Sequence, residues 1–132
     1  MKTNLDSLFG TNLDNEKDGI WFDISEDTGF RLRRFGGNNE RKVKEALAQY
    51  HAPYSRQFEN KTIHSDKEKE ILVKVFCHAC VVDWKGIESE GSELECSFEN
   101  SVKLFTKLPE LFTTLYEYSN DLTSFRDSMG ND

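Results

Sequence analysis

The sequence predicts a mainly helical α+β fold in a single domain, and three observations lead to that prediction. The 132 residues are enough to bury one core and too few for two domains of ordinary size. Aromatic residues make up 12% of the chain, and only two prolines and eight glycines interrupt it, as in folded globular proteins. Apolar residues recur at helical spacing over most of the chain, whereas strand-like alternation is confined to short runs.

We expect an arm, one α+β domain and a flexible tail, which span residues 1–18, 19–128 and 129–132. The arm is polar, but a few apolar residues recur in it at helical spacing: Leu5, Leu8, Phe9 and Leu13. The arm therefore forms either a short helix or a loose segment that docks elsewhere. No internal repeat and no linker divides the domain.

A β-hairpin is predicted at the start of the domain. Residues 19–24 and 30–35 are rich in aromatic and apolar residues and are joined by a turn-forming segment, residues 25–29. In the second run, inward apolar residues alternate with outward basic ones: Phe30, Arg31, Leu32 and Arg33.

A helix is predicted after this hairpin. Gly36-Gly37 ends the strand, and either Asn38 or Asn39 can cap the helix by accepting hydrogen bonds from free backbone N–H groups. One face of the helix is apolar and contains Val43, Leu47 and Tyr50. Pro53 stops or kinks it.

The next predicted helix belongs to the middle of the domain. It begins with a capping box, in which Ser65 and Glu68 satisfy each other's backbone donors. Residues 71–82 are apolar on nearly all sides, so we expect several neighbours to cover this helix. Its predicted end is Asp83-Trp84.

A second hairpin and a pair of helices complete the domain. Residues 86–96 alternate around a glycine turn, which predicts two short strands. Ser97 can cap the following helix, and Pro109 suits the first position of the last helix, where a missing N–H has no consequence. We therefore expect helices over residues 97–107 and 109–128.

The two C-terminal helices carry more apolar residues than one neighbour would normally cover. A seam with steps of four and three contains Leu104, Leu108, Leu111, Leu115, Tyr118, Leu122 and Phe125. A stripe beside it contains Phe105, Phe112 and Tyr116. Two interpretations remain open, because this surface either faces the chain's own core or is offered to another polypeptide. For the second interpretation, the candidate partner-binding residues are Leu104, Leu108, Leu111, Phe112, Leu115 and Tyr116.

The net charge of −7 comes from the C-terminal part of the chain. Residues 1–85 hold 14 basic and 14 acidic side chains, whereas residues 86–132 hold 3 basic and 10 acidic ones. Such an acidic part repels nucleic acid phosphates. One basic cluster contains Arg31, Arg33, Arg34, Arg41, Lys42 and Lys44. We interpret it as solvated strand and helix surface, and the alternative is a nucleic-acid-facing or host-directed regulatory protein.

The cysteines and histidines do not predict an active site. Four of them are enough ligands for a zinc ion: Cys77, Cys80, Cys96 and His64. Cys77 and Cys80, however, lie one turn apart in an apolar helix, where cysteine behaves as a small hydrophobe. We therefore expect core positions for them, with no metal and no cofactor. No histidine lies near a nucleophile and an orienting acid, so we expect a binding protein and not an enzyme.

The chain has no predicted membrane or export segment. No apolar run approaches the roughly 20 residues that span a bilayer, and the N-terminus is too polar for a signal peptide. An odd number of cysteines without an export signal argues for reduced thiols. We expect a cytoplasmic protein without a membrane partner.

Several motifs occur in an order that characterises one protein family. The motifs are Phe30–Asn39, the Asp83-Trp84-Lys85-Gly86 turn, an acidic hairpin, the Ser97-Phe98-Glu99-Asn100 helix start and the Leu108-Pro109-Glu110-Leu111-Phe112 junction. Together they resemble the tail assembly chaperones of long-tailed, non-contractile DNA phages and prophages. The resemblance covers roughly residues 19–128.

The resemblance implies a morphogenesis factor in the host cytoplasm that is absent from the mature virion. Such proteins bind the tape measure protein, keep it soluble and promote polymerisation of the tail tube around it. In many members a longer product of a ribosomal frameshift recruits the tail tube protein. This chain resembles the short product, and Ser128–Asp132 is where an extension would join. Apart from the resemblance, the surplus apolar surface of the two C-terminal helices favours either a homo-oligomer or the binding of a partner helix.

Overall fold

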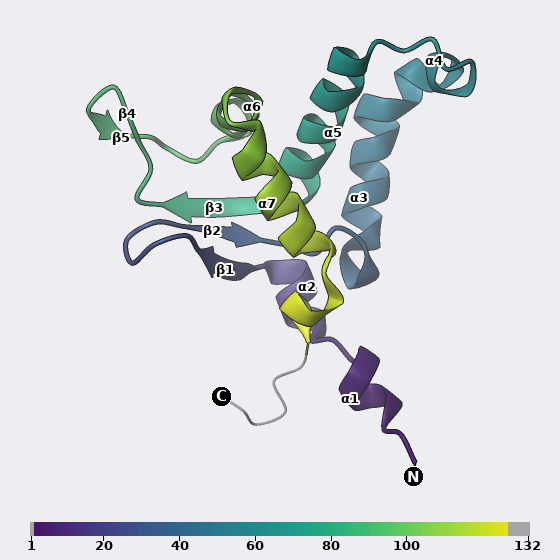
Figure 1. Ribbon diagram of the computed structural model, residues 1–132, viewed down its shortest axis with the longest axis vertical. Coiled ribbons are helices and arrows are strands. Elements are labelled where there is room, and N and C mark those ends of the chain that lie inside the picture. Colours follow the sequence, from purple (N-terminus) through teal and green to yellow (C-terminus); the bar gives the residue numbers. More distant parts are fainter. Residues whose placement is uncertain (1, 127–132) are drawn as a thin grey trace.

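The computed structural model describes residues 2–126 and has a mainly helical α+β fold around a small sheet (Figure 1). Strands β1 (Ile20–Asp23), β2 (Gly29–Leu32) and β3 (Val81–Lys85) are antiparallel and lie in the order β1-β2-β3. A second hairpin consists of β4 (Glu88–Ser89) and β5 (Ser92–Glu93). The predicted fold class and both predicted hairpins are confirmed.

The helices are α1 (Leu5–Phe9), α2 (Leu13–Asp18), α3 (Glu40–Ala46), α4 (Ser55–Glu59), α5 (Ser65–Ala79), α6 (Phe98–Lys107) and α7 (Pro109–Asn120). Short 3-10 turns occupy Gly37–Asn39, Ala52–Tyr54 and Leu122–Phe125, and a π turn occupies Leu47–His51. Figure 1 shows α3 and α5 side by side near one end of the sheet, while α7 runs from α6 towards α2. Within residues 2–126, no helix combines the length and the apolar character that crossing a membrane requires.

The core lies between the sheet and the helices α5, α6 and α7. Phe30 and Leu32 of β2 are fully buried, which confirms the predicted inward alternation. The ring of Phe30 lies 5.9 Å from that of Trp84 on β3 and 6.0 Å from that of Phe105 on α6, measured between centroids. Phe76 of α5 is also fully buried, so α5 has the central place that its apolar sequence predicts.

The predicted end of α5 is wrong, because the helix stops at Ala79 and the chain continues as strand β3. Phe30 pairs with Trp84 across β2 and β3, which places the Trp84 side chain in the core. β-Branched and aromatic residues suit a strand. A continuous apolar run looks alike in a buried helix and in a strand that joins it, so periodicity could not find the boundary.

The predicted caps of α3 and α5 are also different in the structure. Asn39 does not cap α3; its Nδ2 donates to the carbonyls of Arg34 at 2.9 Å and Ala79 at 3.0 Å. This links the β2–α3 loop to the end of α5. The N-cap of α5 is His64, whose Nδ1 accepts from the N–H of Asp66 at 3.1 Å, and no capping box forms.

The inner face of α3 and the end of α7 differ from the prediction. Val43 and Ala46 are buried, whereas Leu47 is 37% exposed because the helix widens to a π turn there. The helix α7 ends at Asn120, since Asp121 is extended and its carboxylate caps the following 3-10 turn. The predicted tail and the predicted helix end at Ser128 lie outside the described residues.

Candidate partner-binding face

The helix pair α6 and α7 changes direction at Leu108. Ser97 caps α6 as predicted, with its Oγ accepting from the N–H of Asn100 at 3.1 Å. Pro109 is the first residue of α7, also as predicted. A residue before proline avoids the helical conformation, and Leu108 has φ −121° and ψ 75°. The break leaves the Leu108 side chain 44% exposed at the corner.

Five of the six predicted partner-binding residues keep exposed surface. We call these five the helix-pair face: Leu104, Leu108, Leu111, Phe112 and Tyr116. Leu108 is exposed, and the other four are half-buried against the core. One side of the helix-pair face therefore packs against the core, and the other side is accessible to a partner.

The sixth predicted residue, Leu115, is fully buried. Ser119, one helical turn further on, is fully buried as well, so this side of α7 faces the interior of the chain. Leu115 is consequently a core residue that has no surface for a partner in this structure. The predicted seam also leaves the helix, since Leu122 and Phe125 lie in the 3-10 turn after α7.

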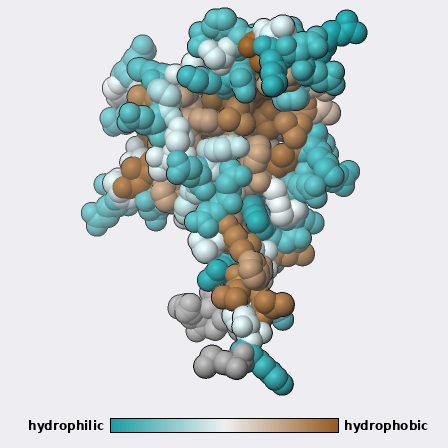
Figure 2. All heavy atoms as spheres, turned by 45° about the vertical axis from the view of Figure 1, so that its right-hand side comes forward, coloured by the Kyte–Doolittle hydropathy of each residue, from teal (hydrophilic) through white to brown (hydrophobic). Residues whose placement is uncertain are grey.

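Aromatic rings join the helix-pair face to the core beneath it. The Phe112 ring lies 5.4 Å from the ring of the buried Phe76 and 5.6 Å from that of Tyr116. The Tyr116 ring in turn lies 5.2 Å from that of Phe35, in the loop after β2. Figure 2 shows hydrophobic side chains in the upper half of the molecule, at the level of α5 and α7, bordered by hydrophilic ones. The chain's own elements therefore cover these rings only in part.

Two lysines border the helix-pair face. Lys103 and Lys107 lie one turn apart on α6, next to Leu104 and Leu108, and both are exposed. Among residues 2–126 neither lysine has an ion-pair partner. They are two of the three basic residues that follow residue 85. The face is therefore apolar with a positive border in an otherwise acidic part of the chain.

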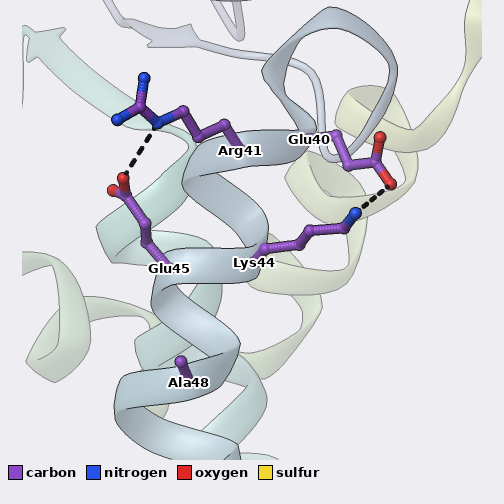
Figure 3. A pocket seen from close by; sticks show the side chains of 5 residues that line it. All are labelled: Glu40, Arg41, Lys44, Glu45 and Ala48. Atoms are coloured by element: carbon purple, nitrogen blue, oxygen red, sulfur yellow. Dashed lines mark ion pairs between the residues drawn. The ribbon is translucent and has the colours of Figure 1, made fainter.

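The basic cluster predicted from the sequence is divided between separate surroundings. Arg34 pairs with the carboxylate of Glu16, and Arg33 Nε donates to the Lys17 carbonyl at 2.7 Å. Figure 3 shows the exposed side of α3, where Arg41 pairs with Glu45 at 3.5 Å and Lys44 pairs with Glu40 at 3.2 Å. These ion pairs reduce the positive charge that α3 offers to a phosphate backbone.

Glu16 is a buried carboxylate that sequence analysis did not identify. It is fully buried and accepts hydrogen bonds from Thr11 Oγ1 at 2.7 Å, from Arg34 and from Asn38. Burial raises the pKa of this carboxyl, but the three hydrogen bonds and the Arg34 charge outweigh burial and lower the pKa below its usual value. Two of the three partners, Arg34 and Asn38, are 18 and 22 residues away along the chain, so local spacing could not predict these contacts.

The four side chains of the zinc alternative do not meet. His64 precedes α5, whereas Cys77 and Cys80 lie at the other end of this helix, roughly 20 Å away at 1.5 Å per residue. Cys77 and Cys80 are buried, as predicted, and burial raises the pKa of both thiols. Neutral thiols are poor metal ligands and poor nucleophiles. Within the described part of the chain, no three His, Cys, Asp or Glu side chains are grouped to hold a metal ion.

One cavity of about 300 Å³ lies between α5, α6 and the π turn, and sequence analysis did not predict it. Its lining residues are Tyr50, Cys77, His78, Val81, Val82, Cys96, Ser97, Phe98 and Ser101. The Tyr50 hydroxyl lies 3.2 Å from His78 Nδ1, and the Tyr50 ring stacks on that of Phe98. Separate segments contribute these side chains, so only the folded chain brings them together.

The fold and the face define a small α+β domain with a partly exposed apolar helix pair. A family model described as YdaY prophage protein matches residues 37–132, nearly three quarters of the chain. The chain therefore belongs to the YdaY prophage protein family. No curated protein and no solved structure matches it. The family confirms the phage or prophage origin that the resemblance implied. The family description does not name a role in tail assembly.

Proposed function

We propose that this prophage protein is a tail assembly chaperone whose helix-pair face binds the tape measure protein. It keeps the tape measure protein soluble and promotes polymerisation of the tail tube around it. The protein acts by binding and not by catalysis. It works in the host cytoplasm and is absent from the mature virion.

The observation that carries this proposal is the partly exposed helix-pair face. An amphipathic helix of a partner can place its apolar stripe on such a face, with side chains three and four residues apart as anchors. Leu108 is the most accessible member, and Phe112 and Tyr116 supply aromatic surface beside it. The sequence resemblance to tail assembly chaperones points to a partner of this kind, and the prophage family supports the phage origin that this role requires.

The charge of the chain also supports binding to a protein partner. Lys103 and Lys107 border the face and can contact acidic side chains of a bound helix. The remaining surface after residue 85 is acidic, which opposes association with DNA or RNA. A net charge far from zero favours solubility, and a chaperone of a hydrophobic protein needs a soluble exterior.

The test is co-purification with the tape measure protein encoded by the same prophage. Leu108→Asp and Leu111→Asp should each reduce the amount of tape measure protein recovered, because a charge replaces an apolar contact. Ile24→Asp is the matched control, since Ile24 is 48% exposed and lies outside the helix pair. Circular dichroism should show the same helical signal in all three variants. Unchanged recovery with both leucine variants would refute this site.

The longer product that would recruit the tail tube protein has a separate test. Its expected starting point at Ser128–Asp132 lies outside the described residues. Mass spectrometry of the protein expressed from its natural messenger should find a minor product extended at the C-terminus. A single product without extension would remove the tail tube protein from the proposed partners.

The alternative function, a nucleic-acid-facing or host-directed regulatory protein, requires free positive charge. Arg34, Arg41 and Lys44 are each paired with a carboxylate, so the structure offers it little support. A gel shift with DNA or RNA that weakens with added salt would favour this alternative over the chaperone.

A further inference from the structure

We propose that α1 of one chain docks on the helix-pair face of a second copy, and that two chains exchange their arms reciprocally. The contact joins two surfaces that occur on every chain. It does not require the tape measure protein, so this inference does not rest on the proposed function.

The helix α1 presents apolar side chains that residues 2–126 of its own chain leave uncovered. Leu5 is 64% exposed, Leu8 46% and Phe9 65%, and none of the α1 residues is buried. Their spacing of three and four residues places them on one side of the helix. Figure 2 shows hydrophobic side chains on the projecting lower part of the molecule, separate from those in the upper half. The arm therefore has an unpartnered apolar side.

A helix as short as α1 needs a packing partner. Asn4 caps it, with Oδ1 accepting from the N–H groups of Asp6 and Ser7, but the helix has only five residues. Isolated helices shorter than about 12 residues are marginal in water, and most helices in proteins are stabilised by packing of an apolar side. The missing packing surface must come from outside the arm.

The arm cannot reach the Leu108 end of its own helix-pair face. Its root is fixed at the 3-10 turn that follows α7, where the Asn12 N–H donates to the Phe125 carbonyl at 2.9 Å and Arg126 donates to the Leu8 carbonyl at 3.0 Å. The 12 residues of α7 span about 18 Å, whereas α1 spans roughly 8 Å. In Figure 1, α1 points away from the α6–α7 corner. The α1 helix of a second chain is not tethered at this point, so it can reach the Leu108 end of the face.

The arm and the face are complementary in chemistry. Leu5, Leu8 and Phe9 supply an apolar stripe, and the face supplies leucines and rings. Asp6 on the arm can contact Lys103 or Lys107 at the border of the face. One α1 helix on one face buries less surface than the roughly 1,200 Å² of a stable interface. Reciprocal exchange forms this contact twice and so doubles the buried area. We therefore expect a dimer that dissociates on dilution.

Light scattering after size exclusion tests the dimer on the full-length chain. The wild type and Ile24→Asp should run as dimers that become monomers on dilution. Phe9→Asp, which alters the arm, and Leu108→Asp, which alters the face, should run as monomers at every concentration. Both residues are exposed, and circular dichroism should confirm that both variants are folded.

A mixing experiment separates arm exchange from association through one shared surface. Tagged Phe9→Asp retains an intact face, and untagged Leu108→Asp retains an intact arm, so the mixture can form one of the two contacts. This mixed dimer should be weaker than the wild-type dimer, and chemical crosslinking at high protein concentration before the pull-down should capture it. Two copies of either variant alone should not associate. A monomeric wild type, a dimeric Phe9→Asp variant, or a mixture without recovery of the untagged chain would each overturn arm exchange. These outcomes are independent of binding to the tape measure protein.

Discussion

Glu16 and Arg34 form an ion pair that joins α2 to the loop after β2. The carboxylate is fully buried, and Thr11 and Asn38 complete its hydrogen bonds. A buried charge is tolerated only when it is paired and hydrogen-bonded. These residues therefore hold the N-terminal segment on the body of the protein.

Replacing Glu16 with Gln should destabilise the protein at neutral pH by about 2 kcal/mol, because Arg34 loses its charged partner. The folded-state pKa of Glu16 lies below the unfolded value, so its contribution is present above the unfolded pKa and is lost as the pH falls through the folded pKa. Urea unfolding should thus show a difference at pH 7 that shrinks in acid below the usual glutamate range. Glu45→Gln is the control, since Glu45 is half exposed. A difference that persists in strong acid would contradict this role.

Leu115 and Leu108 differ in burial, and this difference allows a second prediction for single residues. Leu115 is fully buried and Leu108 is 44% exposed, although both belong to the same predicted seam. Leu115→Ala should lower the free energy of unfolding by about 3 kcal/mol, as expected for a core cavity, and Leu108→Ala by less than about 1 kcal/mol. Denaturant unfolding measures both values. Equal losses would show that Leu108 is also a core residue.

Individual elements show what the sequence could and could not predict. The hairpin β1–β2, the Ser97 cap and the Pro109 start follow from local residue chemistry, and all three are confirmed. Strand β3 was not predicted, because its extended conformation depends on pairing with β2, which lies about 50 residues earlier in the chain. Local propensity cannot report such a tertiary contact.

The candidate site shows the same limit. The seam spacing correctly predicted apolar faces on α6 and α7, but it could not say which side of each helix the chain itself covers. That depends on packing, which buries Leu115 and leaves Leu108 exposed. The apolar spacing of residues 5–9 was visible in the sequence, whereas the exposure of these side chains among the described residues was not.

The turn after β3 allows a prediction at the scale of elements. Gly86 has φ +72°, and a Cβ there would lie 2.1 Å from the Asp27 carbonyl oxygen in the β1–β2 turn. Gly86→Ala should therefore force the two turns apart and cost about 3 kcal/mol, of which the backbone conformation accounts for about 1. Gly91 has φ +82° with open space around it, so Gly91→Ala should cost only the backbone part. Thermal unfolding of both variants tests this ranking, and similar midpoints would contradict it.

For the whole molecule, the structure separates α1, which contributes no core residue, from a body that does. No α1 residue is buried, whereas α2 contributes Glu16 to the body. The body from residue 37 onwards is the part matched by the YdaY prophage family. Arm exchange would therefore require both α1 and the helix-pair face, whereas binding of the tape measure protein would require the helix-pair face alone.

Two truncations test this division. Removal of residues 1–9 should leave the unfolding free energy of the monomer within about 0.5 kcal/mol of the wild type, because only exposed side chains and the exposed hydrogen bond from Arg126 to the Leu8 carbonyl are lost. Removal of residues 1–18 should cost about 3 kcal/mol, since Arg34 loses Glu16 and the α2 contacts disappear. Urea unfolding at a concentration where the wild type is monomeric measures both. A large loss from the shorter truncation would show that α1 packs on its own body, and arm exchange would then have no free helix to act through.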